Sequence, residues 1–316
     1  MGEDIRDLRG LVLRTEKGSV YDGDGMRTVV YMKGCPLHCW WCSTPESQNF
    51  GRELGYMKER CVGCGKCIVE CPADALQLNA NSGIIRDRKK CIACTHCVDA
   101  CAFSAHKVYG TVMTVQEVLD LVAQDSVLYF FSGGGLTFGG GECLGQADFI
   151  AEVMKGCHRQ GINTTIETTL AYPWREVEKV LPYVDVVYVD MKVMDELAHK
   201  KYVGGSTELI RGNLEKIDNS DYPAKIRIRV PTIPGINDTE QNMEALSAFC
   251  RSFQKIEYIE LLPYHRLGIE TYRELGIPYK LPNIKVPDDE KMIELARYMN
   301  GLEGTIPVLV GGVCYR

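Results

Sequence analysis

The sequence predicts an α/β protein: a partial (β/α)6 barrel of the TIM type with a cysteine-rich domain inserted near its start. Short β-branched and aromatic runs alternate with longer segments of helical period, which is the pattern of βα units around a parallel sheet. Eleven of the 15 cysteines fall between residues 35 and 101. We therefore expect the barrel to occupy residues 1–50 and 110–316, and the insert to occupy residues 51–109.

Six segments are expected to form the parallel strands of the barrel. In chain order they are Thr28–Met32, Gly135–Phe138, Asn163–Glu167, Val186–Asp190, Lys225–Val230 and Tyr258–Leu262. Apolar residues recur with helical period between them, and a capping box of Thr114 and Glu117 opens the first such segment. The helices are expected near residues 114–125, 146–160, 174–181, 208–218, 239–254 and 288–300.

Each expected strand ends in residues that a plain core does not need. In βα barrels the carboxyl ends of the strands build the active site, so these residues should meet on one rim. They are Cys35, Gly140, Gly141, Glu142, Glu167, Thr168, Asp190, Lys192, Arg229 and His265.

Composition excludes several classes of protein. The formal net charge of -6 leaves no basic excess for neutralising phosphates, so nucleic acid is not expected as a partner. The first residues form no apolar signal segment, and no run approaches the ~18 apolar residues of a membrane span. The cysteines are spaced as metal ligands rather than as a disulfide framework, which indicates a reducing compartment. We expect a cytoplasmic protein without a membrane partner.

The insert contains two four-cysteine runs. The first is a C-x2-C-x2-C-x3-C-P run, and the second repeats its spacing with Ala102 in place of the proline. This spacing is typical of bacterial ferredoxins with two [4Fe–4S] clusters, and it fits a pair of structural zinc sites less well. In such ferredoxins the fourth cysteine of each run binds the other cluster. The expected ligand sets are Cys61, Cys64, Cys67 and Cys101, and Cys91, Cys94, Cys97 and Cys71.

A third motif, C-x3-C-x2-C, follows the first expected strand and contains Cys35, Cys39 and Cys42. Three ligands on a [4Fe–4S] cluster leave one iron open for another molecule, as a catalytic zinc keeps an open position. The motif resembles the signature of radical S-adenosylmethionine enzymes. The resemblance implies that the open iron binds the amino and carboxylate groups of S-adenosylmethionine, which one electron cleaves to methionine and a 5′-deoxyadenosyl radical.

The flanking segments narrow this resemblance. YDGDGMRTVVYMKGCPLHCWWCSTPES is similar to the N-terminal signature of glycyl radical enzyme activating enzymes, although that family usually has proline where this chain has Asp24. The similarity extends over nearly the whole chain. It includes the cysteine insert, GGGE, the D-x-K of residues 190–192 and ELLPYHRLG. The resemblance implies an oxidoreductase that abstracts hydrogen from a glycine of a partner glycyl radical enzyme. It also implies reduced flavodoxin or ferredoxin as the electron donor, with three [4Fe–4S] clusters in total.

The resemblance also assigns roles around S-adenosylmethionine. Gly140, Gly141 and Glu142 would receive its methionyl amino group, although the same glycines can simply form a tight turn. Asp190 and Lys192 would hold the methionyl amino and carboxylate ends.

The remaining roles are less specific. Glu167 would lie near the ribose hydroxyls, or would help Thr168 and Asp190 to bind a monovalent cation. Arg229 and His265 would line the same pocket, with a structural role as the alternative for the histidine. Trp41 would pack near the cluster and the adenine and shield the cluster.

Two other functions fit parts of the pattern. A radical enzyme acting on a small molecule or another peptide would share the three-cysteine motif, but would be expected to carry its extra clusters near the C-terminus. An electron-transfer protein would use the insert alone, which leaves the open iron unexplained. No role is assigned to Cys143, and the identity of the partner and the purpose of the insert clusters stay open.

Overall fold

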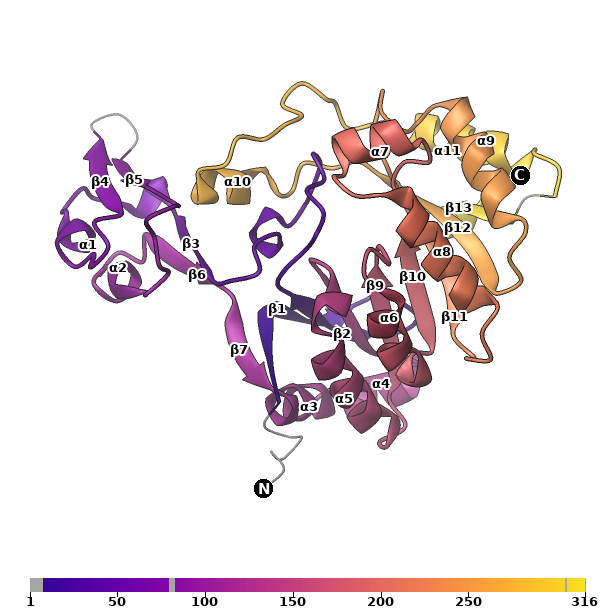
Figure 1. The fold of residues 1–316 in the computed structure, drawn as a ribbon, viewed down its shortest axis with the longest axis horizontal. Helices are drawn as coiled ribbons and strands as arrows, with labels where there is room; N and C mark the ends of the chain where they lie inside the picture. Colours follow the sequence, from indigo (N-terminus) through magenta and orange to yellow (C-terminus); the bar gives the residue numbers. More distant parts are fainter. Residues whose placement is uncertain (1–7, 80–82, 305, 316) are drawn as a thin grey trace.

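The computed structural model describes residues 8–79, 83–304 and 306–315, and these form one open sheet with an attached cysteine-rich module (Figure 1). Within these ranges ten strands are ordered β14-β13-β12-β11-β10-β9-β8-β2-β1-β7. The strands from β2 to β13 pair in parallel, whereas β1, β7 and β14 pair antiparallel at the two edges. The fold is therefore an incompletely closed α/β barrel, as predicted.

All six predicted strands are confirmed, with small extensions at their ends. They are β2 (Arg27–Met32), β8 (Gly135–Gly140), β9 (Asn163–Thr168), β10 (Val186–Asp190), β11 (Lys225–Thr232) and β12 (Ile256–Pro263). The structure adds four strands to the sheet that the sequence did not indicate. These are β1 (Arg9–Ser19), β7 (Thr111–Thr114), β13 (Val308–Val310) and β14 (Val313–Cys314).

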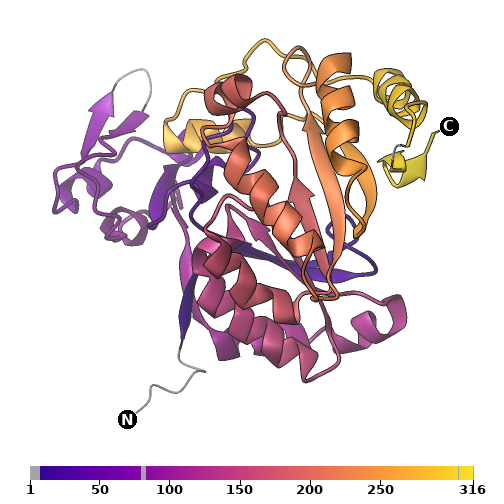
Figure 2. The ribbon, with the colours of Figure 1, turned by 45° about the vertical axis from the view of Figure 1, so that its right-hand side comes forward.

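The helices lie outside the sheet and bury one apolar face against it (Figure 2). The six expected helices are α3 (Val115–Ala123), α5 (Ala147–His158), α6 (Trp174–Val180), α8 (Thr207–Asp218), α9 (Glu240–Cys250) and α11 (Asp289–Asn300). Both hydrogen bonds of the predicted capping box between Thr114 and Glu117 are present. Three helices were not expected: α4 (Ser126–Ser132), α7 (Glu196–Tyr202) and α10 (Ile269–Leu275).

The cysteine-rich module is built from two short ladders and two single-turn helices, and it stands to one side of the barrel beside α10 (Figure 1). Strand β3 (Glu53–Tyr56) pairs with β6 (His106–Tyr109), and β4 (Leu76–Asn79) pairs with β5 (Gly83–Arg86). The helices are α1 (Lys66–Val69) and α2 (His96–Asp99). Because these elements are short, the module depends on its own small core around the cysteines.

A buried charge network attaches the insert to the barrel. The Lys33 ammonium, whose side chain is 0% exposed, follows β2 and donates to Glu53 at 3.1 Å. Glu53 also pairs with Arg88, and Arg88 donates to the Leu275 carbonyl of α10 at 3.0 Å. Burial lowers the pKa of Lys33, and Glu53 opposes that shift. A buried ammonium with a carboxylate partner fixes geometry, so this network sets how the insert sits on the barrel.

The loop between β1 and β2 crosses beneath the barrel and is fastened by Arg27. This guanidinium is 0% exposed and donates to the Leu136 carbonyl at 2.6 Å and to the Asn163 side chain at 3.0 Å. It also reaches the backbone carbonyl of Asp24 at 3.0 Å. One side chain thus joins the loop to β8 and β9.

No helix among the described residues is long and apolar enough to cross a membrane.

Candidate active site at the carboxyl ends of the strands

A cavity of about 380 Å³ opens where the parallel strands end. Ligand pockets for small molecules usually begin near this size. The structure brings twelve predicted site residues together around it: Cys35, Cys39, Trp41, Cys42, Gly140, Gly141, Glu167, Thr168, Asp190, Lys192, Arg229 and His265.

Backbone contacts between two loops hold the three-cysteine segment over the cavity. The Gly34 amide donates to the Ser47 carbonyl at 2.7 Å, and the Gly34 carbonyl accepts from the Glu142 amide at 2.8 Å. A Cβ at Gly141 would lie 2.4 Å from the Gly34 carbonyl oxygen. The loop before Cys35 can therefore approach the GGGE segment this closely only because residue 141 is a glycine.

The three cysteines of this loop fit the ligand set of an iron–sulfur cluster. Burial raises the pKa of Cys35, Cys39 and Cys42, to about 12 for Cys39. Alone they would be neutral thiols, whereas a bound metal converts coordinating thiols to thiolates. Three soft donors that line one cavity, one of them buried and two half-buried, thus suit an iron–sulfur cluster.

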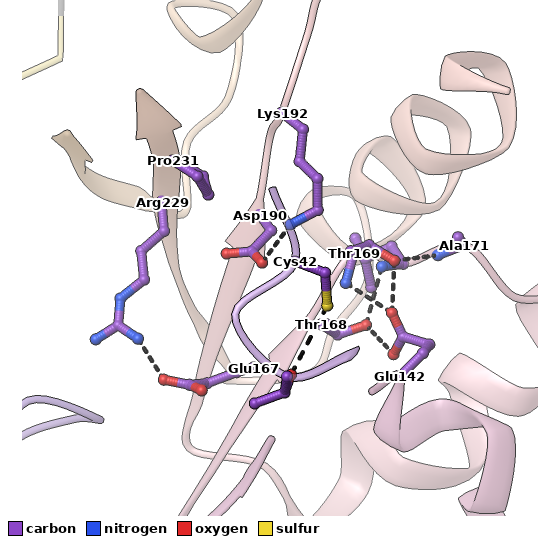
Figure 3. A network of polar contacts seen from close by, with 12 residues as sticks. Cys42, Glu142, Glu167, Thr168, Thr169, Ala171, Asp190, Lys192, Arg229 and Pro231 are labelled. Atoms are coloured by element: carbon purple, nitrogen blue, oxygen red, sulfur yellow. Dashed lines mark hydrogen bonds and ion pairs between the residues drawn. The ribbon is translucent and has the colours of Figure 1, made fainter. Parts of the chain in front are cut away.

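Glu142 faces away from the cavity, unlike the two glycines before it. Its carboxylate accepts from the Thr168 hydroxyl at 2.6 Å, from the Thr169 amide at 2.7 Å and from the Thr169 hydroxyl at 2.5 Å (Figure 3). It is 1% exposed, and it does not line the cavity. Burial raises its pKa and these hydrogen bonds lower it. Glu142 therefore joins the end of β8 to the end of β9.

Asp190 and Lys192 form an ion pair at the end of β10, with the Lys192 ammonium 2.8 Å from the Asp190 carboxylate. Figure 3 shows this pair between two other sets of contacts: the Arg229–Glu167 pair and the hydrogen bonds that Glu142 receives from the threonines. Burial disfavours the charge of Lys192, but Asp190 and Cys39 outweigh burial and raise the pKa of Lys192. The site therefore holds a permanent cation and its counter-ion close to the cysteine loop.

Glu167 pairs with Arg229 across the floor of the cavity (Figure 3). Arg229 also donates to the Tyr21 carbonyl at 2.5 Å, and its guanidinium lies 3.9 Å from the centre of the Tyr188 ring. Burial raises the pKa of Glu167; Arg229 opposes that shift and nearby Asp22 adds to it, giving a pKa of about 7. Glu167 is thus a carboxyl group that changes charge near neutral pH.

Aromatic and apolar side chains close the cavity. Trp41 is 7% exposed and packs with Leu37, Ile233 and Tyr264 in a buried cluster beside the cysteine loop. Trp40 lies outside the cavity, edge-on to Tyr202 at 5.0 Å between ring centres. His265 lies at the exposed rim.

The pocket includes residues that were not predicted, among them Asp22 and Thr169. Asp22 lies in the loop beneath the barrel, so no strand pattern in the sequence points to it. Thr169 lies two residues beyond a predicted strand end, and extending that end by two residues could have found it. Cys143 is buried and its thiol donates to the Glu167 carbonyl at 3.5 Å.

The insert contains two small cavities, each lined by four cysteines and by residues of both ladders. The first cavity is lined by Cys61, Cys64, Cys67 and Cys101. The second is lined by Cys71, Cys91, Cys94 and Cys97. The structure thus exchanges the fourth cysteine between the two runs, in the arrangement that the ferredoxin spacing predicts.

Comparison with known proteins defines the class. A family model described as "Radical SAM superfamily" matches residues 92–246, and one described as "4Fe-4S dicluster domain" matches residues 53–102. A radical SAM methyltransferase from Sphaerobacter thermophilus aligns over 95% of this chain and 76% of its own, with a TM-score of 0.51 and 12% identity. At that identity the likeness concerns the fold alone. The chain has the fold of a radical S-adenosylmethionine protein.

Two curated relatives place it more narrowly. The chain is 36% identical over 298 residues to an indoleacetate decarboxylase activating enzyme of Tractidigestivibacter scatoligenes, covering 92% of this chain and 94% of that protein. It is 42% identical over 268 residues to an isethionate sulfite-lyase activating enzyme of Oleidesulfovibrio alaskensis, covering 83% and 86%. The chain belongs to the glycyl radical enzyme activating enzymes, which confirms the resemblance seen in the sequence.

Proposed function

We propose that this chain installs a radical on a glycine of a partner glycyl radical enzyme. Cys35, Cys39 and Cys42 would hold an iron–sulfur cluster, which would supply one electron for the cleavage of S-adenosylmethionine to methionine and a 5′-deoxyadenosyl radical. That radical would take a hydrogen atom from the glycine. One observation carries the proposal: one buried and two half-buried cysteines share a cavity with an ion pair and a carboxyl group suited to the charges of S-adenosylmethionine.

The residues of the cavity have separate tasks in this proposal. Lys192 binds the methionyl carboxylate and Asp190 the methionyl amino group, because each offers the opposite charge. The backbone at Gly140 and Gly141 faces the amino group. Glu142 acts through Thr168 and Thr169 by fixing the end of β9, so it is a positioning residue.

Glu167 and Arg229 form the other wall of the proposed cofactor site. Glu167 accepts from the ribose hydroxyls, and Arg229 holds it in place. A monovalent cation between Glu167, Thr168 and Asp190 is the alternative. We favour the direct role because both carboxylates already have cationic partners, Arg229 and Lys192.

The walls of the cavity exclude water and leave one side for the partner. Trp41, Leu37, Ile233 and Tyr264 are buried and cover the cysteine loop. A dry site protects a reactive radical from side reactions. The sheet is open between its edge strands β7 and β14, and we propose that a glycine-bearing loop of the partner enters through the side of the barrel.

The insert is proposed to carry two further [4Fe–4S] clusters, making three in all, in a domain that spans residues 51–109. The two four-cysteine cavities support this number, and the pairing of β3 with β6 from Glu53 to Tyr109 supports the bounds. Reduced flavodoxin or ferredoxin is the proposed electron donor. A cytoplasmic location fits this requirement for reduced partners.

Cys39→Ala tests the function, with Cys314→Ala as a matched control because Cys314 is exposed and remote from the cavity. The anaerobically reconstituted wild type should hold about 12 irons, and S-adenosylmethionine should change the electron paramagnetic resonance signal of the reduced protein. Cys39→Ala should hold about 8 irons, lose this response and form no glycyl radical doublet on the partner. Radical formation by Cys39→Ala would contradict the proposal. About 8 irons in the wild type, with no response, would favour an electron-transfer protein.

A further inference from the structure

The insert repeats its structure after thirty residues, and the repeat extends beyond the cysteine spacing. The Ala75 amide donates to the Cys71 sulfur at 3.3 Å, and the Ala105 amide donates to the Cys101 sulfur at the same distance. The two ladders follow the same offset, since β4 and β6 each begin five residues after the fourth cysteine of their run. The two cluster sites are therefore built alike, and any chemical difference between them stands out.

The repeat is broken at the ladder positions beside the cysteines. In one ladder Leu76 pairs with Arg86, and in the other His106 pairs with Tyr56. Leu76 and Arg86 line the cavity of Cys71, Cys91, Cys94 and Cys97, whereas His106 lines the other cavity. At equivalent ladder positions one half of the repeat has the Arg86 guanidinium, which lines a cavity, and the other half has the Tyr56 phenol, which is not among the residues that line the other cavity.

The Arg86 guanidinium is held inside the insert without a carboxylate partner. It donates to the Leu54 carbonyl and lies 3.0 Å from Nδ1 of buried His106. Its Nε is buried and has no hydrogen-bond partner. In the described part of the chain Arg86 forms no ion pair, so its charge is available to whatever occupies the adjacent cavity.

Arg86 borders the same cavity as Cys97, one of its four cysteines. The other cavity includes Lys66, but Lys66 is exposed and water screens its charge. The two sites thus differ by one positive charge that is partly shielded from water.

We propose that Arg86 raises the reduction potential of the cluster held by Cys71, Cys91, Cys94 and Cys97 above that of its neighbour, so that this cluster is the first of the two to be reduced. The proposal rests on the proposed function only in requiring that the insert holds two [4Fe–4S] clusters. Each reduction adds one electron, and therefore one negative charge, to a cluster. A half-buried cation that borders the cavity of a cluster stabilises the more negative state of that cluster.

The test uses the full chain with Cys35, Cys39 and Cys42 all replaced by alanine, so that only the insert clusters contribute. The reconstituted protein is reduced stepwise with dithionite and followed by electron paramagnetic resonance. Two one-electron steps are expected, separated by at least about tenfold in equilibrium constant, or about 59 mV. Arg86→Gln should lower the higher step by at least about tenfold and should move the lower step by less than about threefold.

Two further variants separate the charge from general disturbance. Arg86→Lys keeps a cation and should retain most of the higher potential. Lys90→Gln removes a charge next to Cys91, but from an exposed side chain, and should shift neither step by more than about twofold.

Several results would overturn the proposal: one unresolved step in the parent chain, equal shifts of both steps, a shift of the lower step alone, or an equal effect of Lys90→Gln. If Arg86→Gln holds fewer than about 8 irons, Arg86→Lys decides the question: two separate steps with most of the higher potential retained support the proposal, and merging of the two steps overturns it. Because no readout involves S-adenosylmethionine, failure here is distinct from failure of the proposed function.

Discussion

Two neighbouring carboxyl groups, Glu142 and Glu167, show how the same side chain takes different tasks at adjacent strand ends. Glu142 receives hydrogen bonds from Thr168 and Thr169, so its buried charge is satisfied within the protein. Glu167 has Arg229 as its partner, but it also faces the cavity. A satisfied buried carboxylate holds structure, whereas one that faces a cavity can respond to a ligand.

The raised pKa of Glu167 predicts a pH dependence of cofactor binding. Below its pKa of about 7 the carboxyl is protonated, and above it the carboxylate is charged. S-adenosylmethionine carries a sulfonium cation, so binding favours the charged form and must release a proton at lower pH. The affinity of the reconstituted protein should therefore rise by about three- to tenfold as pH increases from about one unit below 7 to about one unit above. Anaerobic calorimetry in buffers of different ionisation enthalpy measures both the affinity and the proton release.

Glu167→Gln is the control for this pH dependence. It keeps the shape of the side chain but cannot titrate, so the affinity should become flat across the same pH range. A variant that keeps the full slope would assign the dependence to another group.

At the scale of elements, the loop from β1 to β2 explains why this chain has Asp24 where its family usually has proline. Asp24 accepts two hydrogen bonds from Arg227 of β11, at 2.9 and 2.8 Å. This bidentate pair lowers the pKa of Asp24. Arg227 also pairs with Glu257 of β12 at 2.8 Å. The Asp24–Arg227 pair thus fastens the loop to β11, and Arg27 fastens the same loop to β8 and β9.

Removal of this tie should have a small, salt-dependent effect. Asp24→Asn should lower the thermal midpoint by about 2 °C, which corresponds to about 1 kcal/mol for a partly exposed bidentate pair. In about 1 M salt the difference from wild type should shrink, since salt screens exposed charges. Glu270→Gln removes an exposed pair with Arg273 and should change the midpoint by less than about 1 °C. An equal decrease of the thermal midpoint in both variants would show that the Asp24–Arg227 pair stabilises the fold no more than an ordinary exposed ion pair does.

At the scale of the whole molecule, strands with a regular apolar pattern could be predicted from the sequence, whereas the positions of the loops could not. The strands β2 and β8 to β11 contain nearly continuous buried runs, and the proposed site residues follow the parallel strands because these strands end on one rim. Strand β1 was missed because five consecutive exposed residues interrupt its apolar pattern. Asp22 lies in the site because the loop from β1 to β2 passes there. The position of that loop depends on the contacts of Arg27 with Leu136 and Asn163, which are far from it in the sequence. The Glu142 side chain points away from the cavity because Thr168 and Thr169 donate hydrogen bonds to its carboxylate. Only the fold brings these threonines near Glu142, so the sequence could not predict this orientation.

The relation between insert and barrel is likewise a property of the whole molecule, and Glu53 is its central contact. Glu53 touches both Lys33, two residues before Cys35, and Arg88, three residues before Cys91. It therefore joins the cysteine loop of the barrel to the cysteine runs of the insert. A second contact, between Tyr109 and Glu274, lies on the same interface but involves no buried cation.

Glu53→Gln should loosen the insert without unfolding it. The change leaves the buried Lys33 ammonium with neutral acceptors alone, among them the Glu46 and Asn49 carbonyls at 2.6 and 3.0 Å. Breaking a buried pair in this way costs about 3 kcal/mol, so amides of β3 and β6 should exchange with deuterium up to about 100-fold faster in the reconstituted protein. Glu274→Gln should accelerate exchange at the same amides by less than about tenfold, since it removes one hydrogen bond. The iron content should stay unchanged in both variants. Equal protection in Glu53→Gln and wild type would mean that apolar contacts with α10, rather than the charge network, hold the insert in place.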